Sequence, residues 1–184
     1  SVQGQVIPAT GTDVMLWAEL ETGEKIFGES LIGKSTKPIS RIGCLPENPS
    51  ALPTALDAIK EADLIVLGPG SLYTSLLPNL LVPEIVEALL KSDAPKIYIS
   101  NLMTQPGETD GLDVYQHIKS IEKQLFNFGV NTRIFNAILS QGEFEGSSLI
   151  DYYRSRGAEP VICNKKRLVS EGYHVLQAPL YSKR

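Results

Sequence analysis

The sequence predicts an α/β protein: a Rossmann-like, doubly wound and mainly parallel sheet with an N-terminal β-hairpin region. Three observations favour this class. Apolar residues recur with a period of two before residue 46, short apolar runs alternate with helical patterns after residue 50, and no repeat or low-complexity linker interrupts the chain. We therefore expect residues 1–184 to form a single domain, β-rich over residues 1–46 and alternating between helix and strand over residues 51–184.

The β-rich region contains a predicted hairpin. In residues 13–21 the side chains alternate between an apolar face and a mixed face, which is the pattern of a strand. The sequence ETGE at residues 21–24 predicts a turn, and residues 25–29 return as the second arm. A short strand near residues 41–45 follows a loop, and residues 5–9 also have a strand-like composition.

The second region alternates helices with short strands, which right-handed crossovers would assemble into a parallel sheet. Strands are expected over residues 64–67, 96–100, 133–139 and 161–163. Helices are expected over residues 51–61, 113–128 and 147–156, and also after residue 70, with an interruption at Pro78 and a restart near Pro83. Residues 64–67 are apolar at every position, which is typical of a strand that helices cover on both faces.

Ligands of such sheets bind outside the carboxyl ends of the strands, and this rule selects two loops. The first loop has the sequence GPGSLYTS at residues 68–75. Gly68 and Gly70 allow close approach to the backbone, and Ser71 is placed to cap a helix whose N-terminus faces the crevice. Free N–H groups and a partial positive charge there can hold phosphate or pyrophosphate. The alternative is a plain turn in which Ser71 only caps the helix.

The second loop, NLMTQPGETDG at residues 101–111, is longer than most loops between a strand and a helix. Asn101 and Gln105 can read the edge of a base or sugar, while Glu108 or Asp110 can bind a ribose hydroxyl or a magnesium ion. The alternative is that Asp110 or Thr109 merely caps the next helix.

The two loops together supply the predicted ligand-binding residues, and the sequence assigns no catalytic residue. The predicted set is Gly68, Pro69, Gly70, Ser71, Tyr73, Thr74, Ser75, Asn101, Thr104, Gln105, Glu108, Thr109 and Asp110. His117 and His174 are expected to be structural, and no arrangement of nucleophile and base stands out.

Composition argues against several classes of partner. The net charge is −4 without a basic patch, so nucleic acid is not an expected partner. The apolar runs fall far short of the roughly 20 residues that a membrane span needs. No secretory signal opens the sequence, and Cys44 and Cys163 lack metal-type spacing. We therefore expect two buried thiols in a cytoplasmic protein.

Both loops carry a family resemblance. GPGSLYTSLLPNLLVPEI and NLMTQPGETDG resemble the signature segments of the bacterial gluconeogenesis factor family, which belongs to the CofD-like superfamily and is related to phospholactate transferase. QVIPAT and DVMLWAELETGEKIFGES resemble the middle of that family's chain, so the resemblance covers nearly all residues. It implies a Rossmann-like fold, a cytoplasmic location and a UDP-sugar ligand such as UDP-N-acetylglucosamine. It also implies a role in cell shape and in growth on gluconeogenic carbon sources.

One segment of that family has no counterpart in this sequence. Family members begin with a strand and a glycine-rich nucleotide loop of the Gly-Gly-Gly-Thr-Gly type, which would lie before Ser1. The resemblance therefore implies the C-terminal portion of a longer chain that holds part of the cleft. A sheet without its first strands would expose an apolar edge or lean on a partner.

Three functional hypotheses follow. The first is a non-catalytic regulator that binds a nucleotide sugar. The second is a phospholactate-transferase-like enzyme that uses a nucleotide-linked donor, with magnesium held near Glu108 or Asp110. The third is an interaction module in which the hairpin at residues 13–29 docks a second copy of the chain, as a homodimer, or another protein, with Trp17 and Phe27 supplying the apolar contact.

Overall fold

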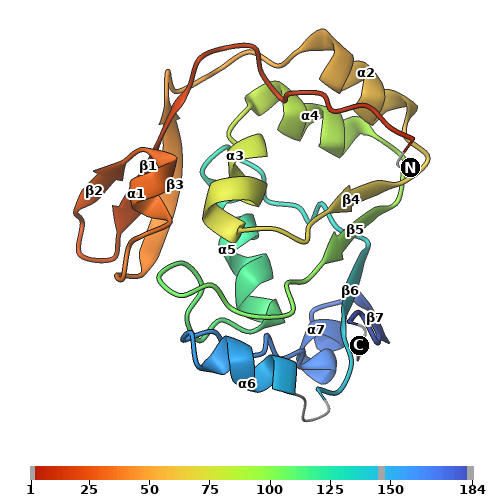
Figure 1. The fold of residues 1–184 in the computed structure, drawn as a ribbon. Helices are drawn as coiled ribbons and strands as arrows, with labels where there is room; N and C mark the ends of the chain where they lie inside the picture. Colours follow the sequence, from red (N-terminus) through yellow and green to blue (C-terminus); the bar gives the residue numbers. More distant parts are fainter. Residues whose placement is uncertain (1–2, 145–147, 182–184) are drawn as a thin grey trace.

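The computed structural model describes residues 3–144 and 148–181, which build two sheets with helices packed around them (Figure 1). The smaller sheet is antiparallel, with the strand order β2-β1-β3. The larger sheet is parallel, with the order β4-β5-β6-β7. An α/β fold with a mainly parallel sheet and an N-terminal antiparallel region is therefore confirmed.

The strands and helices have the following bounds. The strands are β1 Met15–Leu20, β2 Lys25–Phe27, β3 Ile39–Leu45, β4 Ile65–Leu67, β5 Lys96–Ile99, β6 Ala137–Gln141 and β7 His174–Ala178. The helices are α1 Glu29–Ile32, α2 Pro53–Glu61, α3 Leu77–Asn79, α4 Pro83–Lys91, α5 Val114–Phe126, α6 Ser148–Arg154 and α7 Lys165–Ser170, with one π-helical turn, η1 Leu72–Leu76. None of the helices within these described residues combines the length and apolar character that a membrane crossing requires.

The fourth predicted strand is misplaced. Residues 161–163 form no strand, because this segment pairs with the loop after β5 rather than with the sheet: Pro160 bridges Met103, and the Val161 N–H donates to the Leu102 carbonyl. The fourth strand is β7 instead, and it lies parallel to β6. The third strand also begins later than residue 133, at Ala137.

Smaller corrections concern the N-terminal segment and the helix predicted over residues 147–156. Residues 5–9 form no strand, and the nearest pairing is a single bridge between Thr10 and Ala51. The predicted helix is α6, which begins at Ser148, while residue 147 lies outside the described residues. Cys44 is buried but Cys163 is only half-buried, and both are free thiols.

Helix α5 follows directly from its sequence. Val114, Ile118, Ile121 and Leu125 recur at helical spacing, and all four are buried in the core. Asp113 accepts a hydrogen bond from the Gln116 N–H at 2.8 Å, and the Gln116 side chain accepts one from the Asp113 N–H at 2.8 Å. This reciprocal capping box satisfies two N–H groups at the start of the helix. The alternative in which Asp110 or Thr109 caps α5 is therefore wrong.

Strand β3 joins the small sheet to the rest of the protein. The buried Gln124 side chain of α5 donates to the Ile42 carbonyl at 3.2 Å and accepts from the Ile42 N–H at 3.4 Å. The Tyr73 hydroxyl of η1 donates to the Ile39 carbonyl at 3.2 Å. These bonds satisfy backbone groups on an edge strand, so the small sheet is held against α5 and η1.

The capping box supplies a first prediction. Asp113→Ala should lower the free energy of unfolding by about 1 kcal/mol, because the N–H groups at the start of α5 lose their acceptor. Urea unfolding measures the change. The control is Asp57→Ala at an exposed site within α2, which removes a carboxylate but no cap and should have little effect. Equal losses in the two variants would contradict the capping role.

Candidate functional site

The two predicted loops lie against each other at the carboxyl edge of the parallel sheet. Strands β4 and β5 are paired in parallel, so both loops leave the same edge. The Asn101 side chain accepts a hydrogen bond from the Gly70 N–H at 3.1 Å and donates to the Gly70 carbonyl at 2.9 Å. Asn101 is buried, and this pairing fixes the first loop on the start of the second.

The first loop packs closely against strand β5, and this contact requires a glycine at position 68. Gly68 has a φ of +91°, and a Cβ at this position would lie 2.5 Å from the Ile99 carbonyl oxygen. A larger residue would therefore be strained and would collide with β5. Pro69 is exposed, while Gly70 is half-buried and has both backbone groups bonded to Asn101. Packing of the chain on itself therefore accounts for the glycine at position 68.

A carboxylate of the protein lies at the N-terminus of η1, where a phosphate was expected. Glu108 accepts hydrogen bonds from the Tyr73 N–H at 3.3 Å and from the Thr74 hydroxyl at 3.0 Å. Ser71 holds the N-cap position as expected, but its side chain makes no capping hydrogen bond. The positive end of this turn is thus neutralised from within the protein.

Burial affects the ionisation of Glu108. The side chain is only 6% exposed, and this burial raises the pKa of its carboxyl above the ordinary value. The hydrogen bonds from Thr74 and Tyr73 oppose this shift in pKa, while the negative charge of Glu29 adds to it. A cavity of about 180 Å³ lies beside this carboxyl, and Tyr73, Asp110 and Lys123 contribute to its lining.

Most of the remaining predicted residues hold the second loop in shape. The Thr104 hydroxyl accepts from the Glu159 N–H at 2.9 Å, the Thr109 hydroxyl accepts from the Gln105 N–H at 2.8 Å, and Asp110 accepts from the Gly107 N–H at 2.7 Å. Tyr73 is buried, so its ring is turned away from solvent. Ser75 and Asp110 are exposed, and Ser71, Thr74 and Gln105 are half-buried. Their contact with a ligand stays a prediction.

The residues predicted to hold magnesium make hydrogen bonds within the protein. Both oxygens of Glu108 already accept hydrogen bonds, and one oxygen of Asp110 is bonded to Gly107. Across residues 3–144 and 148–181, no group of three or more His, Cys, Asp or Glu side chains is placed to hold a metal ion. Magnesium binding near Glu108 or Asp110 stays a prediction.

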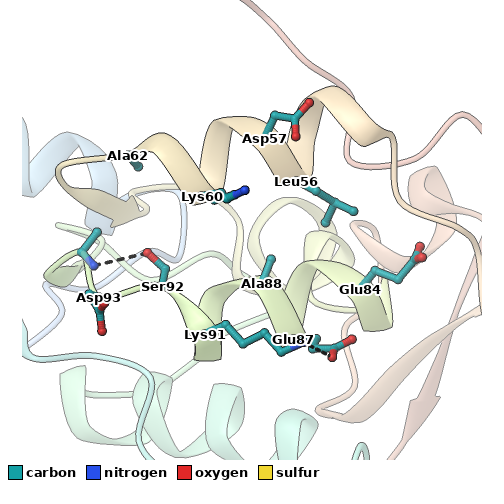
Figure 2. Close-up of a pocket in the computed structure, with 11 residues that line it drawn as sticks. Leu56, Asp57, Lys60, Ala62, Glu84, Glu87, Ala88, Lys91, Ser92 and Asp93 are labelled. Atoms are coloured by element: carbon teal, nitrogen blue, oxygen red, sulfur yellow. Dashed lines mark hydrogen bonds and ion pairs between the residues drawn. The ribbon is translucent and has the colours of Figure 1, made fainter.

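A large groove lies at the opposite edge of the sheet (Figure 2). It encloses about 610 Å³ between α2 and α4, and Ala62 and Asp93 place it near the amino ends of β4 and β5. Lys91 in this groove is paired with Glu87 at 2.6 Å. Because ligands of parallel sheets bind at the carboxyl edge, size alone does not make this groove the functional site.

A small aromatic pocket, which the sequence reasoning missed, lies at the carboxyl edge. It encloses about 30 Å³, so a ligand ring would lie across its mouth rather than inside it. Its lining comes from the segments after β5, β6 and β7 and from α6: Leu102, Met103, Phe144, Ile150, Tyr153 and Tyr181. The Phe144 and Tyr181 rings are stacked, with centroids 6.2 Å apart.

The aromatic pocket was missed because two strand ends were misplaced. Phe144 follows β6, which ends at Gln141 rather than at residue 139, and Tyr181 follows β7, which was not expected. The signal available in the sequence was the apolar pair Val175 and Leu176, which lies between two Gly- or Pro-containing segments and precedes an aromatic side chain.

The hairpin predicted to dock a second copy presents an aromatic surface. Trp17 and Phe27 are paired in register on adjacent strands, and Phe27 is exposed. Lys25 lies 4.6 Å from the centroid of the Trp17 ring, and Arg41 lies 5.3 Å from it. These cation–π contacts stabilise the indole in place. Dimerisation through this surface stays a prediction.

Comparison with known proteins gives consistent matches. The family model described as "2-phospho-L-lactate transferase CofD" matches residues 1–181. A relative from Nostoc sp. is 46% identical, and the match covers 97% of this chain but 38% of the relative. Relatives from Halalkalibacterium halodurans and Bacillus subtilis, both named gluconeogenesis factor, are 44% and 40% identical over 94% and 96% of this chain.

Solved structures agree with these matches. A crystal structure of a UPF0052 family member from Bacillus halodurans is 42% identical and superimposes with a TM-score of 0.88, covering 96% of this chain and 56% of that protein. A second structure from the same organism gives a TM-score of 0.91 at 41% identity and covers 100% of this chain and 57% of that one. This chain thus spans about half the length of the relatives from Halalkalibacterium halodurans and Bacillus subtilis, at 52% and 54%.

Glu108 should make stability depend on pH. Because its pKa is raised, the folded chain binds this proton more tightly than the unfolded chain does. The free energy of unfolding should therefore fall as the pH rises from about 4.3, the pKa of an unfolded glutamate, through the raised folded pKa. Glu108→Gln stays neutral at every pH, so its free energy of unfolding should fall less over this range.

Urea unfolding at a series of pH values, from about 4 to about 8, measures this difference. Glu61→Gln, at an exposed carboxylate that ends α2, is the control and should keep the pH profile of the unmodified chain. If the free energy of unfolding changes with pH by the same amount in Glu108→Gln and in the unmodified chain, the pKa of Glu108 is not raised.

Gly68 should be required for stability. Gly68→Ala introduces both a strained φ and a contact 2.5 Å from the Ile99 oxygen, so a loss of at least about 2 kcal/mol in the free energy of unfolding is expected. Gly111→Ala is the matched control, because Gly111 has a φ of +70° but open space around it. Its loss should be about 1 kcal/mol. If the two losses are equal in urea unfolding, the contact with Ile99 is not the cause.

Proposed function

The chain belongs to the CofD family, and from this membership we propose that it binds a nucleotide sugar as a regulatory protein of the gluconeogenesis factor type. The proposed ligand is a UDP-sugar such as UDP-N-acetylglucosamine. The proposed role is in growth on gluconeogenic carbon sources and in cell shape, within the cytoplasm. Relatives of which this chain spans about half carry the name gluconeogenesis factor, which supports this assignment.

The aromatic pocket is the observation that carries the proposal. Segments that follow three neighbouring parallel strands meet there, at the edge of the sheet where nucleotides bind in doubly wound folds. Stacking of a base on aromatic side chains contributes about 1–3 kcal/mol per base. Tyr153 from α6 and the stacked pair Phe144 and Tyr181 offer such surfaces for a uracil ring or an acetylated sugar.

Arg156, which two tyrosine rings connect to the aromatic pocket, is the proposed partner of the diphosphate. The Arg156 guanidinium lies 3.7 Å from the centroid of the Tyr152 ring, and this ring in turn contacts Tyr153 of the aromatic pocket. Within the described part of the chain, Arg156 has no carboxylate in ion-pair contact, whereas Arg154 is paired with Glu159 at 3.0 Å. An arginine that no carboxylate occupies is suited to a phosphate oxygen.

We propose a supporting role for the first loop. The Gly70 and Tyr73 N–H groups already donate to Asn101 and Glu108, so they are not available to a phosphate in this conformation. We propose that Gly68, Gly70 and Asn101 set the position of the second loop, which carries Leu102 and Met103 into the aromatic pocket. Exposed Ser75 and Asp110 stay available for polar contacts.

Calorimetric titration with UDP-N-acetylglucosamine tests the proposal. Binding to this chain, or to the full-length Bacillus halodurans relative at the equivalent site, should weaken about 10-fold in Tyr153→Ala, because one stacking surface is lost. The control is Tyr115→Ala on α5, whose ring is held by Arg167 and Lys119 outside the aromatic pocket. Its affinity should stay within about 2-fold of the unmodified chain.

Two results would contradict the proposal. Equal affinities for the two variants would remove the aromatic pocket as the site. Absence of binding to both proteins, together with turnover of a nucleotide-linked phospholactate donor, would favour the transferase alternative.

A further inference from the structure

The stacked aromatic pair of the pocket, Phe144 and Tyr181, lies beyond the ends of the two strands that lead to it. The ladder between β6 and β7 ends with Gln141 opposite Ala178. Each ring therefore belongs to a segment that has already left the sheet. The position of the two rings depends on how these two segments are held together.

The Gln141 side chain holds the two segments together. It lies at the end of β6 and is only 4% exposed. Its Nε2 donates a hydrogen bond to the Glu143 carbonyl at 3.1 Å, and its Oε1 accepts one from the Leu180 N–H at 2.7 Å. Glu143 directly precedes Phe144, and Leu180 directly precedes Tyr181. One buried carboxamide thus fixes the backbone immediately before both rings.

A carboxamide is suited to this position because it offers a donor and an acceptor on one planar group. An ionised carboxylate would offer no donor to the Glu143 carbonyl. An aliphatic side chain would leave both backbone groups of the bridge without this partner. Gln141 is not among the described residues that line the aromatic pocket, so its influence on a ligand passes through the two rings.

We propose that Gln141 is a positioning residue for the ligand of the aromatic pocket, an inference that rests on the proposed function. Gln141 holds Phe144 and Tyr181 in their stacked arrangement before the ligand binds, with an angle of 14° between the ring planes. A preformed aromatic surface is suited to a planar ring such as uracil, because ordering the two side chains during binding would reduce the affinity.

Gln124 provides a matched control elsewhere in the protein. It is also buried, at 5% exposed, and its carboxamide also bonds one backbone N–H and one backbone carbonyl, both of Ile42. These bonds hold β3 against α5, and Gln124 is not among the described residues of the aromatic pocket. Methionine has a similar size to glutamine, so either substitution removes two buried hydrogen bonds and the two variants differ in location.

Calorimetric titration with UDP-N-acetylglucosamine measures the effect on the ligand. Gln141→Met should weaken binding about 10-fold, the loss expected for one stacking surface, whereas Gln124→Met should stay within about 2-fold of the unmodified protein. In a Tyr181→Ala background, Gln141→Met should change the affinity less than about 2-fold, because the stacked pair that it positions no longer exists.

A second measurement needs no ligand. Fluorotyrosine at position 181 gives a fluorine NMR signal that reports the ring current of Phe144, and the signal is assigned by its loss in Tyr181→Phe. Gln141→Met should move this signal toward its position in Phe144→Ala, while Gln124→Met should leave it in place. Circular dichroism and the unfolding midpoint establish that each variant is folded during the measurement.

A milder variant replaces Gln141→Met if that variant does not fold. The carboxamide in Gln141→Asn is one methylene too short to make both hydrogen bonds, so the Tyr181 signal should move in the same direction. The affinity for UDP-N-acetylglucosamine should fall with it.

Three results would overturn the proposal. The first is an unmoved Tyr181 signal in the Gln141 variants, because Gln141 would then not hold the aromatic pair. The second is an equal loss of affinity in Gln141→Met and Gln124→Met, which would reduce the effect to general destabilisation. The third is a moved signal with unchanged affinity, since the pair would then not receive the ligand.

Failure of the proposed function gives a different result. The unmodified protein would then not bind UDP-N-acetylglucosamine at all, and the ligand role of Gln141 would be overturned with it. The Tyr181 signal would still decide separately whether Gln141 positions the two rings.

Discussion

The hydrogen bonds between Asn101 and Gly70, together with those from Tyr73 and Thr74 to Glu108, hold the carboxyl edge of the sheet in one arrangement. In both cases a side chain of the second loop satisfies backbone groups of the first. Leaving such buried groups without partners costs about 1–3 kcal/mol each. The geometry of the carboxyl edge, the route of the second loop and the position of the aromatic pocket all depend on this pairing.

The same pairing explains which features of the site the sequence could predict. The two loops and their polar residues were identifiable, since strand ends and glycines are visible in a sequence. Whether Glu108 faces a ligand or the N-terminus of η1 depends on how loops 35 residues apart pack, and no local pattern encodes that. A carboxylate and a phosphate meet the same N–H groups, so the first loop has the chemistry of an anion site in either case.

The sequence predicted helices and strands correctly where a single periodicity was clear. The prediction was wrong where an apolar segment pairs with a loop instead of with the sheet. Helix α5 and strand β1 have clear periods of 3.6 and two, and their positions match the expectation. Residues 161–163 have the apolar composition of a strand, but the Val161 N–H donates to the Leu102 carbonyl. This segment therefore pairs with the loop after β5 and not with the sheet.

The aromatic pocket depends on the pairing of the two loops, because both lie at one edge of the sheet. Ile99 ends β5 and is followed by Asn101, which is bonded to Gly70, and then by Leu102 and Met103 of the aromatic pocket. On the other side of the pocket, β7 leads to Tyr181. The hydrogen bonds of Asn101 therefore set where the second loop starts, and with it the position of two side chains that line the pocket. A substitution that released Asn101 from Gly70 would alter the pocket without changing any residue that lines it.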